Sequence, residues 1–294
     1  MFHSRVTRAV LSGLLWCSFP APAGTGFVPQ ADLKKEVRQR YAGKLLLLSA
    51  PSRFDLIHFD AQGHPTREPT GEPWTTCGLV RARKINMRDR QMTIDGERVI
   101  VALDPEPPGT KLISVNVDRE VHVTIELPPS IHNPTELSTF LAQVFSMEGL
   151  EHKIANAWRA DVDLKALEDA SMLPPDGRIG TLESGQAVYA WESGVVTKPK
   201  AFYKPLPTYA ADALSKRVSG TIQVRVIVNE KGFPEILEVI QHLPEGLDAR
   251  VLSAVSQWRF QPGLRDGVAA ATLVIVEIKF HLRSAKREAG HSGR

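Results

Sequence analysis

The sequence predicts an α+β protein with a β-rich domain at residues 28–172, flanked by helices, and a smaller domain at residues 203–282. The smaller domain is expected to combine two helices with a three-stranded antiparallel sheet. Short apolar runs separated by glycine and proline dominate the first region, which is typical of strands joined by turns. In the second region, apolar residues recur at helical spacing between stretches in which they alternate with polar residues.

The pattern in the smaller domain predicts helix, strand, strand, helix and strand in that order. The expected segments are residues 210–218, 220–228, 235–240, 247–258 and 272–282. In the first strand, Ile222 and every second residue after it share an apolar face. Gly232 closes a loop of hairpin length. Pro262 must lie beyond the second helix, because proline cannot continue a helix. These segments are expected to form one small sheet with a helix on one face.

This segment resembles the C-terminal domain of TonB energy transducers. The matching pieces, in chain order, are Pro207-Thr208-Tyr209, Gly220-Thr221, Gly246-Leu247-Asp248, Trp258-Arg259-Phe260-Gln261-Pro262-Gly263 and Asp266-Gly267. Their order and spacing make the resemblance specific, rather than any single piece. Four residues are expected to serve the core and the backbone of the domain rather than a ligand: Trp258, Phe260, Pro262 and Gly232.

The resemblance implies a binding function. In the family, the last long strand of the domain receives the TonB box of an outer-membrane transporter as an added strand, which supports energy-coupled transmembrane transport. The matching partner-binding residues are Pro207, Tyr209, Leu273, Val274, Ile275, Val276, Glu277 and Lys279. The chain departs from the family pattern at Leu206 and Ala210, where the family has glutamine and a second proline. Strand addition is not affected by this departure, because it uses backbone groups.

Residues 1–23 have the pattern of a secretory signal peptide. Arg5 and Arg8 precede a short apolar run over residues 9–19, and Ala21-Pro22-Ala23 fits a cleavage site. The run is short for a permanent membrane-spanning helix. We therefore expect export to the periplasm, with retention of the signal as an inner-membrane anchor as the alternative.

The β-rich domain is similar to an uncharacterised domain that precedes TonB-type C-terminal domains in some bacterial proteins. The expected strands cover residues 45–48, 54–59, 79–85, 92–94, 99–103, 112–117 and 121–127, and the expected helices cover residues 32–41, 133–145 and 149–167. Asp95-Gly96 predicts a tight hairpin, and Asp118-Arg119 a second turn. Asn133 before Pro134 predicts a capped helix start.

Two further segments have no domain of their own. Residues 173–202 are expected to be a linker, in which the apolar stretch Val188-Tyr189-Ala190-Trp191 can dock as a strand. Residues 283–294 are rich in Ser, Gly, Lys and Arg and are expected to form a disordered basic tail.

Composition and motifs exclude several function classes. The chain of 294 residues has 36 basic and 33 acidic residues, and this near balance argues against a nucleic-acid-binding surface. No nucleophile motif, paired-carboxylate signature, phosphate loop or zinc spacing of histidines is visible, so no enzyme activity, catalytic residue, cofactor or metal is expected. Cys77 is the one cysteine that remains after the expected cleavage, and it is expected to be buried.

Two functions remain open. The first is a TonB-like envelope protein that binds an outer-membrane TonB-dependent transporter, with inner-membrane proton-channel proteins as the further partners that the resemblance implies. The second is a periplasmic binding or scaffold protein, in which the TonB-like module docks intramolecularly or forms a homodimer without energy transduction. The β-rich domain would then recognise the ligand.

Overall fold

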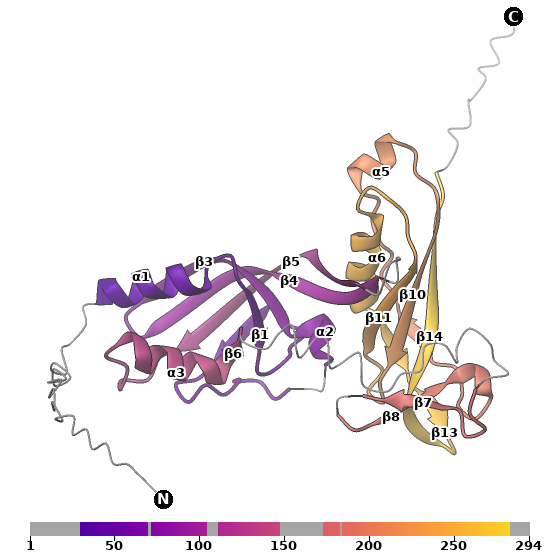
Figure 1. The fold of residues 1–294 in the computed structure, drawn as a ribbon, viewed down its shortest axis with the longest axis horizontal. Helices are drawn as coiled ribbons and strands as arrows, with labels where there is room; N and C mark the ends of the chain where they lie inside the picture. The colour runs from indigo at the N-terminus through magenta and orange to yellow at the C-terminus, as the bar shows by residue number, and fades with distance from the viewer. Residues whose placement is uncertain (1–29, 70–71, 105–110, 148–172, 183, 283–294) are drawn as a thin grey trace, which may run out of the picture.

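The computed structural model describes residues 30–69, 72–104, 111–147, 173–182 and 184–282, and it has few helices and many strands (Figure 1). This content agrees with the predicted mixed class. Within these residues, no helix has the length and apolar character needed to cross a membrane. The predicted signal peptide, the predicted helix over residues 149–167 and the predicted basic tail lie outside the described residues.

The elements of the N-terminal part come first in the chain. They are α1 (Gln30–Tyr41), β1 (Leu45–Leu48), β2 (Leu56–Phe59), α2 (Trp74–Cys77), β3 (Leu79–Arg88), β4 (Gln91–Asp104), β5 (Lys111–Glu126), α3 (Pro134–Val144) and β6 (Phe145–Ser146). Leu33 and Val37 of α1 and Leu141 of α3 lie in one buried cluster with strand residues such as Ile94. The two helices therefore cover the same core of a strongly curved sheet (Figure 1).

The start of α3 follows the sequence prediction. Asn133 has an extended backbone, and its side-chain oxygen accepts a hydrogen bond from the amide of Glu136 at 3.0 Å. Pro134 occupies the first helical turn, where its missing N–H group has no helical partner to lose. The cap and the proline together fix where the helix begins.

The two turns predicted inside the N-terminal sheet are wrong. Residues Asp95-Gly96 lie within β4, which continues without a break, and the reversal occurs between β3 and β4 at Asp89, where φ is 49°. A Cβ on Gly96 would stand 2.5 Å from the carbonyl oxygen of Arg81, so this glycine permits a close approach of β3. Asp118-Arg119 likewise lies within β5.

The elements of the C-terminal part follow residue 173. They are β7 (Arg178–Thr181), β8 (Ala187–Ala190), the 3-10 turn η3 (Trp191–Ser193), β9 (Lys200–Tyr203), α5 (Ala211–Ser215), β10 (Gly220–Val228), β11 (Pro234–Gln241), α6 (Leu247–Ser256), β12 (Arg259–Gln261), β13 (Gly263–Arg265) and β14 (Val268–Phe280). Strand β10 pairs antiparallel with β11 on one side and with β14 on the other. The apolar faces of these strands and of α6 share one buried cluster.

The two parts share a sheet and a core. Strand β11 pairs in parallel with β4 through Glu238 and Leu103, and the cluster under α6 also contains Ile100, Ala102 and Val117 from the N-terminal part. The C-terminal sheet is thus not a separate three-stranded sheet, because it continues into β4 on one side and into β8 on the other. Figure 1 shows the N-terminal part lying crosswise to the C-terminal part, which extends above and below their junction.

The segment predicted as a linker contributes strands to this assembly. Strand β8 pairs in parallel with β14, β7 pairs with β8, and β9 pairs antiparallel with β12. The apolar stretch predicted to dock as a strand corresponds to β8. The described residues of this segment therefore extend the C-terminal sheet beyond β14 and form a second, two-stranded sheet with β12, instead of only connecting two domains.

Candidate functional site: the edge of strand β14

Strand β14 (Val268–Phe280) pairs with β10 over residues 272–280 and with two further strands over residues 268–273. Its partner β10 runs from Gly220 opposite Phe280 to Val228 opposite Thr272. Strand β13 pairs with residues 268–270, and β8 pairs with residues 271–273 on the side opposite β10. Among the residues that the structure describes, no strand pairs with this side of residues 274–280. We call this side of residues 274–280 the free edge.

Side chains along the free edge alternate between the core and the solvent. Val274, Val276, Ile278 and Phe280 are buried in the cluster beneath α6. Ile275 is 45% exposed, and Glu277 and Lys279 also point outward. This alternation is typical of a sheet with one buried face. The outward face thus offers one apolar and two charged side chains to a neighbouring chain.

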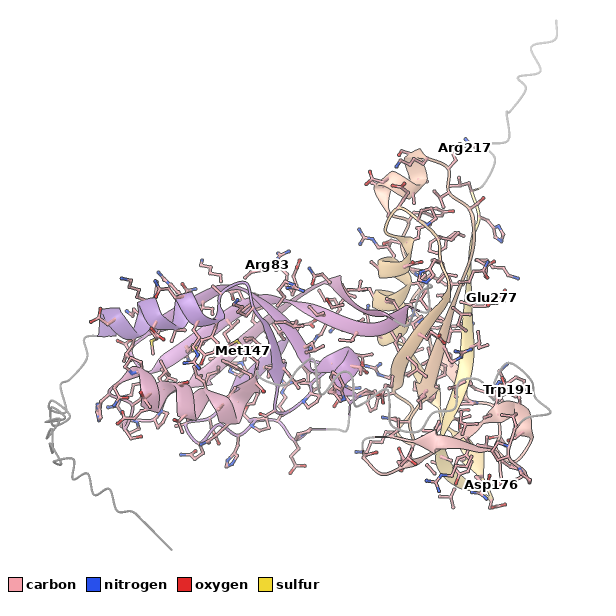
Figure 2. The ribbon with its side chains drawn as sticks, in the orientation of Figure 1. Arg83, Met147, Asp176, Trp191, Arg217 and Glu277 are labelled. Atoms are coloured by element: carbon pink, nitrogen blue, oxygen red, sulfur yellow. The ribbon has the colours of Figure 1, made fainter. Side chains whose placement is uncertain are left out.

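The two outward charges pair with each other. The ammonium group of Lys279 lies 2.9 Å from a carboxylate oxygen of Glu277, and the side-chain amide of Gln223 on β10 donates to the same carboxylate at 3.3 Å. The hydrogen bond from Lys279 lowers the pKa of Glu277, and the hydrogen bond from Gln223 lowers it further. Figure 2 places Glu277 on the flank of the C-terminal part that faces away from the N-terminal arm.

The start of the free edge is marked by a turn. After β8 pairs Ala190 with Leu273, the chain leaves the sheet through η3, and Gly194 reverses it with φ of 78°. Trp191 packs against the same apolar cluster as the inward residues of β14, and the ammonium group of Lys198 lies 4.0 Å from its ring centroid. A strand added along the free edge would therefore begin beside Trp191 (Figure 2).

The structure brings most of the predicted partner-binding residues together. Val274, Ile275, Val276, Glu277 and Lys279 belong to the free edge, whereas Leu273 is buried and paired with Ala190.

Of the other two predicted partner-binding residues, Pro207 and Tyr209, the second lies at the C-terminal end of β14. The ring of Tyr209 packs edge-on against Phe280 with centroids 5.0 Å apart, and its hydroxyl group donates to the carbonyl of Val218 at 3.2 Å. Pro207 is half-buried. Tyr209 thus already has a structural partner at the end of the strand. Phe202, which no sequence motif indicates, is 69% exposed beside the proline-rich stretch.

The residues predicted to support the domain tie its loops to the end of α6. Trp258 is buried, and its indole N–H group donates to the carbonyl of Pro205 at 3.0 Å. Gly232 has φ of 78°, and a Cβ there would stand 1.9 Å from the carbonyl oxygen of Phe260. Phe260 is buried, and Pro262 is half-buried beside it in sequence. These contacts fix the segment that leads into the domain and the β10–β11 hairpin relative to the core.

The chemistry of the site is that of a binding surface. Within the described ranges, no group of three or more His, Cys, Asp or Glu side chains could hold a metal ion. What the free edge presents is a row of backbone N–H and C=O groups, which an extended peptide can satisfy by adding a strand.

The segment that contains this edge is similar to known proteins. Residues 205–282 match the family model described as the Gram-negative bacterial TonB protein C-terminal. Protein TonB of Klebsiella pneumoniae is 34% identical over 89 residues, which are 30% of this chain and 35% of that protein. A solution structure of the Pseudomonas aeruginosa TonB C-terminal domain aligns with 30% of this chain and 90% of its own, at 22% identity and a TM-score of 0.26.

The chain covers only about a third of the length of this curated relative. The family match covers the segment in which the sequence motifs lie, which confirms the resemblance there. Residues 205–282 of this chain therefore form a domain of the TonB C-terminal family.

Proposed function

We propose that this chain is a TonB-like protein of the cell envelope, whose C-terminal domain binds an extended segment of an outer-membrane transporter by strand addition. The free edge of β14 is the observation that carries this proposal. The match of residues 205–282 to the TonB C-terminal family supports it, because the resemblance to this family implies a role in energy-coupled transport. The transporter segment, which corresponds to the family's TonB box, would support energy-coupled transport in concert with inner-membrane proton-channel proteins.

The geometry of the edge limits the bound segment. Seven residues of strand extend over about 24 Å, which suits a short peptide of similar length. Main-chain hydrogen bonds would supply most of the affinity, and the outward side chains would add selectivity. Ile275 offers an apolar contact near the start of the edge, and the Glu277–Lys279 pair offers charges near its end.

A proline scan over residues 274–280, in full-length protein, tests the strand-addition mechanism. Proline removes the backbone donor of a strand residue. At positions whose N–H group faces the free edge, we expect proline to abolish binding of a synthetic TonB-box peptide, measured by calorimetry, while circular dichroism shows a folded domain. Glu277→Ala is the matched control and should change the affinity little, since it leaves the backbone groups in place.

Two results of the scan would contradict strand addition. In one, every proline variant is unfolded or binds as well as the wild type. In the other, Glu277→Ala alone removes binding. A contact based on side chains, and not on the backbone of β14, would then explain the affinity.

A second candidate function is favoured by the position of β8. This strand of the same chain already occupies residues 271–273 of β14, as expected for a module that docks intramolecularly. A periplasmic scaffold built in this way would recognise its ligand through the N-terminal part. Cell fractionation separates the two functions, because an energy transducer should remain with the inner membrane and a scaffold should appear with the soluble periplasmic proteins.

A further inference from the structure

An open cleft of about 360 Å³ lies where the N-terminal and C-terminal parts meet. Its walls come from both parts of the chain, and three of its six lining residues are arginines. The lining residues are Arg53, Phe54, Arg119, Tyr203, Gln257 and Arg259. This cleft belongs neither to the free edge of β14 nor to the contacts of Trp258 and Tyr209 with the core.

The fold positions each arginine separately. Arg119 belongs to β5, and its guanidinium group donates to the carbonyl of Arg53 at 2.9 Å. Arg259 begins β12 and is paired with Tyr203 of β9. The guanidinium group of Arg259 donates to the carbonyl of Trp258 at 2.5 Å and lies 4.8 Å from the ring centroid of Phe233. These contacts fix the side chains of Arg119 and Arg259, which both line the cleft.

A fourth arginine lies behind the cleft. Arg98 is 1% exposed, and it donates to the carbonyl groups of Cys77 and Phe54, the second at 2.9 Å. Burial lowers the pKa of Arg98, and the positive charge of Arg119 lowers it as well. The positive charge of the cleft therefore continues into the protein interior.

Carboxylates balance this charge only in part. Glu72 lies 3.6 Å from Arg53, and Asp55 lies 2.5 Å from Arg119. Among the described residues, Arg259 has no carboxylate within 4.0 Å, and its charge is met by carbonyl oxygens and by the face of Phe233. Burial lowers the pKa of Arg259, and the charges of Arg53 and Arg119 lower it further, against the opposing charge of Glu72.

Partly buried positive charges without full compensation are costly, and a bound anion removes that cost. A guanidinium group suits an oxyanion in particular, because its planar array of donors matches two oxygens of a phosphate or a carboxylate. We propose that this cleft binds an oxyanion ligand, held by Arg53, Arg119 and Arg259 with the hydroxyl group of Tyr203 at its rim.

The size of the cleft indicates the size of the ligand. An open cleft of about 360 Å³ has room for an anion larger than a single phosphate ion. A multiply charged anion of the size of pyrophosphate or citrate fits both the volume and the excess of positive charge. Since its contacts would come from both the N-terminal and the C-terminal part, such a ligand would also stabilise their junction.

Calorimetric titration of the full-length protein with pyrophosphate and, separately, with citrate at constant ionic strength tests this site. The two anions decide whether the cleft prefers phosphate or carboxylate oxygens. We expect at least one to bind, and Arg259→Gln and Arg119→Gln each to weaken binding by at least about tenfold, as the loss of a charge-assisted bidentate contact implies. The matched control is Arg88→Gln. Arg88 is exposed at the end of β3, beside the start of β4, whereas β4 meets the C-terminal part near its other end, at Leu103.

Further variants keep the test decisive if one substitution disturbs folding. Arg259→Lys retains the charge but loses the fork of donors, so its affinity should lie between those of the wild type and Arg259→Gln. Arg53→Gln changes a side chain that is 39% exposed, and it should weaken binding in a folded protein. The proposal is overturned if neither anion binds the wild type at millimolar concentration. It is equally overturned if the cleft variants bind as tightly as Arg88→Gln.

Discussion

The two halves of strand β14 lie in different surroundings. Residues 271–274 are buried without alternation, because the helix-covered core lies on one face and a second cluster, formed with β7 and β8, lies on the other. From residue 275 onward, buried and exposed side chains alternate, and the strand pairs only with β10. Strand β14 thus serves as an interior strand at residues 271–273, which we call its first half, and as an edge strand at residues 274–280, which we call its second half.

This difference shows that the chain itself covers part of the edge of β14. An unpaired strand edge is a template for any extended chain, and proteins commonly cover part of such an edge. Here β8 covers residues 271–273, and η3 turns the chain away before residue 274. The position of β8 therefore defines the register at which a partner can begin.

The largest effect on stability should come from a substitution in the core beneath the second half of β14. Trp258→Ala removes a buried side chain that packs near Phe260 and donates to Pro205, and it should lower the free energy of unfolding by about 3–5 kcal/mol. Urea unfolding monitored by circular dichroism measures this change. The control is Leu206→Ala, which removes a side chain that is 80% exposed and should change the stability by at most about 0.5 kcal/mol. Equal effects of the two substitutions would contradict the placement of the core under α6.

A smaller effect is expected from the cluster that covers the first half. Val188 is fully buried against Leu273 and Ile179, so Val188→Ala should lower the stability by about 1–3 kcal/mol. The loss should be local, with faster amide exchange in β8 and unchanged exchange in α6. Gln186→Ala, just before β8, is the control and should leave exchange unchanged. Uniformly faster exchange throughout the C-terminal part would show that the two halves of β14 unfold as one unit.

The sequence predicts local elements better than it predicts which strands meet. The predicted strand over residues 45–48 agrees with β1, and the predicted helix over residues 32–41 falls within α1. The start of α3 follows from Asn133 and Pro134. Such signals act within a few residues. Asp95-Gly96 fails for a physical reason. Glycine is needed both in tight turns and where another backbone approaches closely, and only the position of Arg81 shows which case applies.

At the candidate site, too, the sequence predicts local elements but not the strand pairing. The alternation in β14 identifies its outward residues, and the apolar stretch around Val188 indicates a docked strand. No local signal specifies that β8 pairs with residues 271–273, and therefore none predicts that Leu273 is covered. The cleft arginines are a clearer case still, since Arg53, Arg119 and Arg259 are distant in sequence and meet only through tertiary packing.

The smallest effect should come from the outward charges of the second half. Because the hydrogen bond from Lys279 is the main cause that lowers the pKa of Glu277, Lys279→Ala should raise that pKa toward its ordinary value, while the contact with Gln223 keeps it from returning completely. Carbon-detected NMR titration of the Glu277 carboxyl group measures the change, and Lys231→Ala, at an exposed lysine in the β10–β11 hairpin, is the control.

The sign of the linked stability follows from the direction of this shift. A lowered pKa in the folded state contributes stability that is present above the unfolded pKa and is lost as the pH falls through the folded pKa. The contribution is small, because both groups are exposed and the solvent screens them. Lys279→Ala should therefore leave the stability at neutral pH nearly unchanged. A large loss at neutral pH would show that the second half of β14 is covered by another part of the chain, which would end its distinction from the first half.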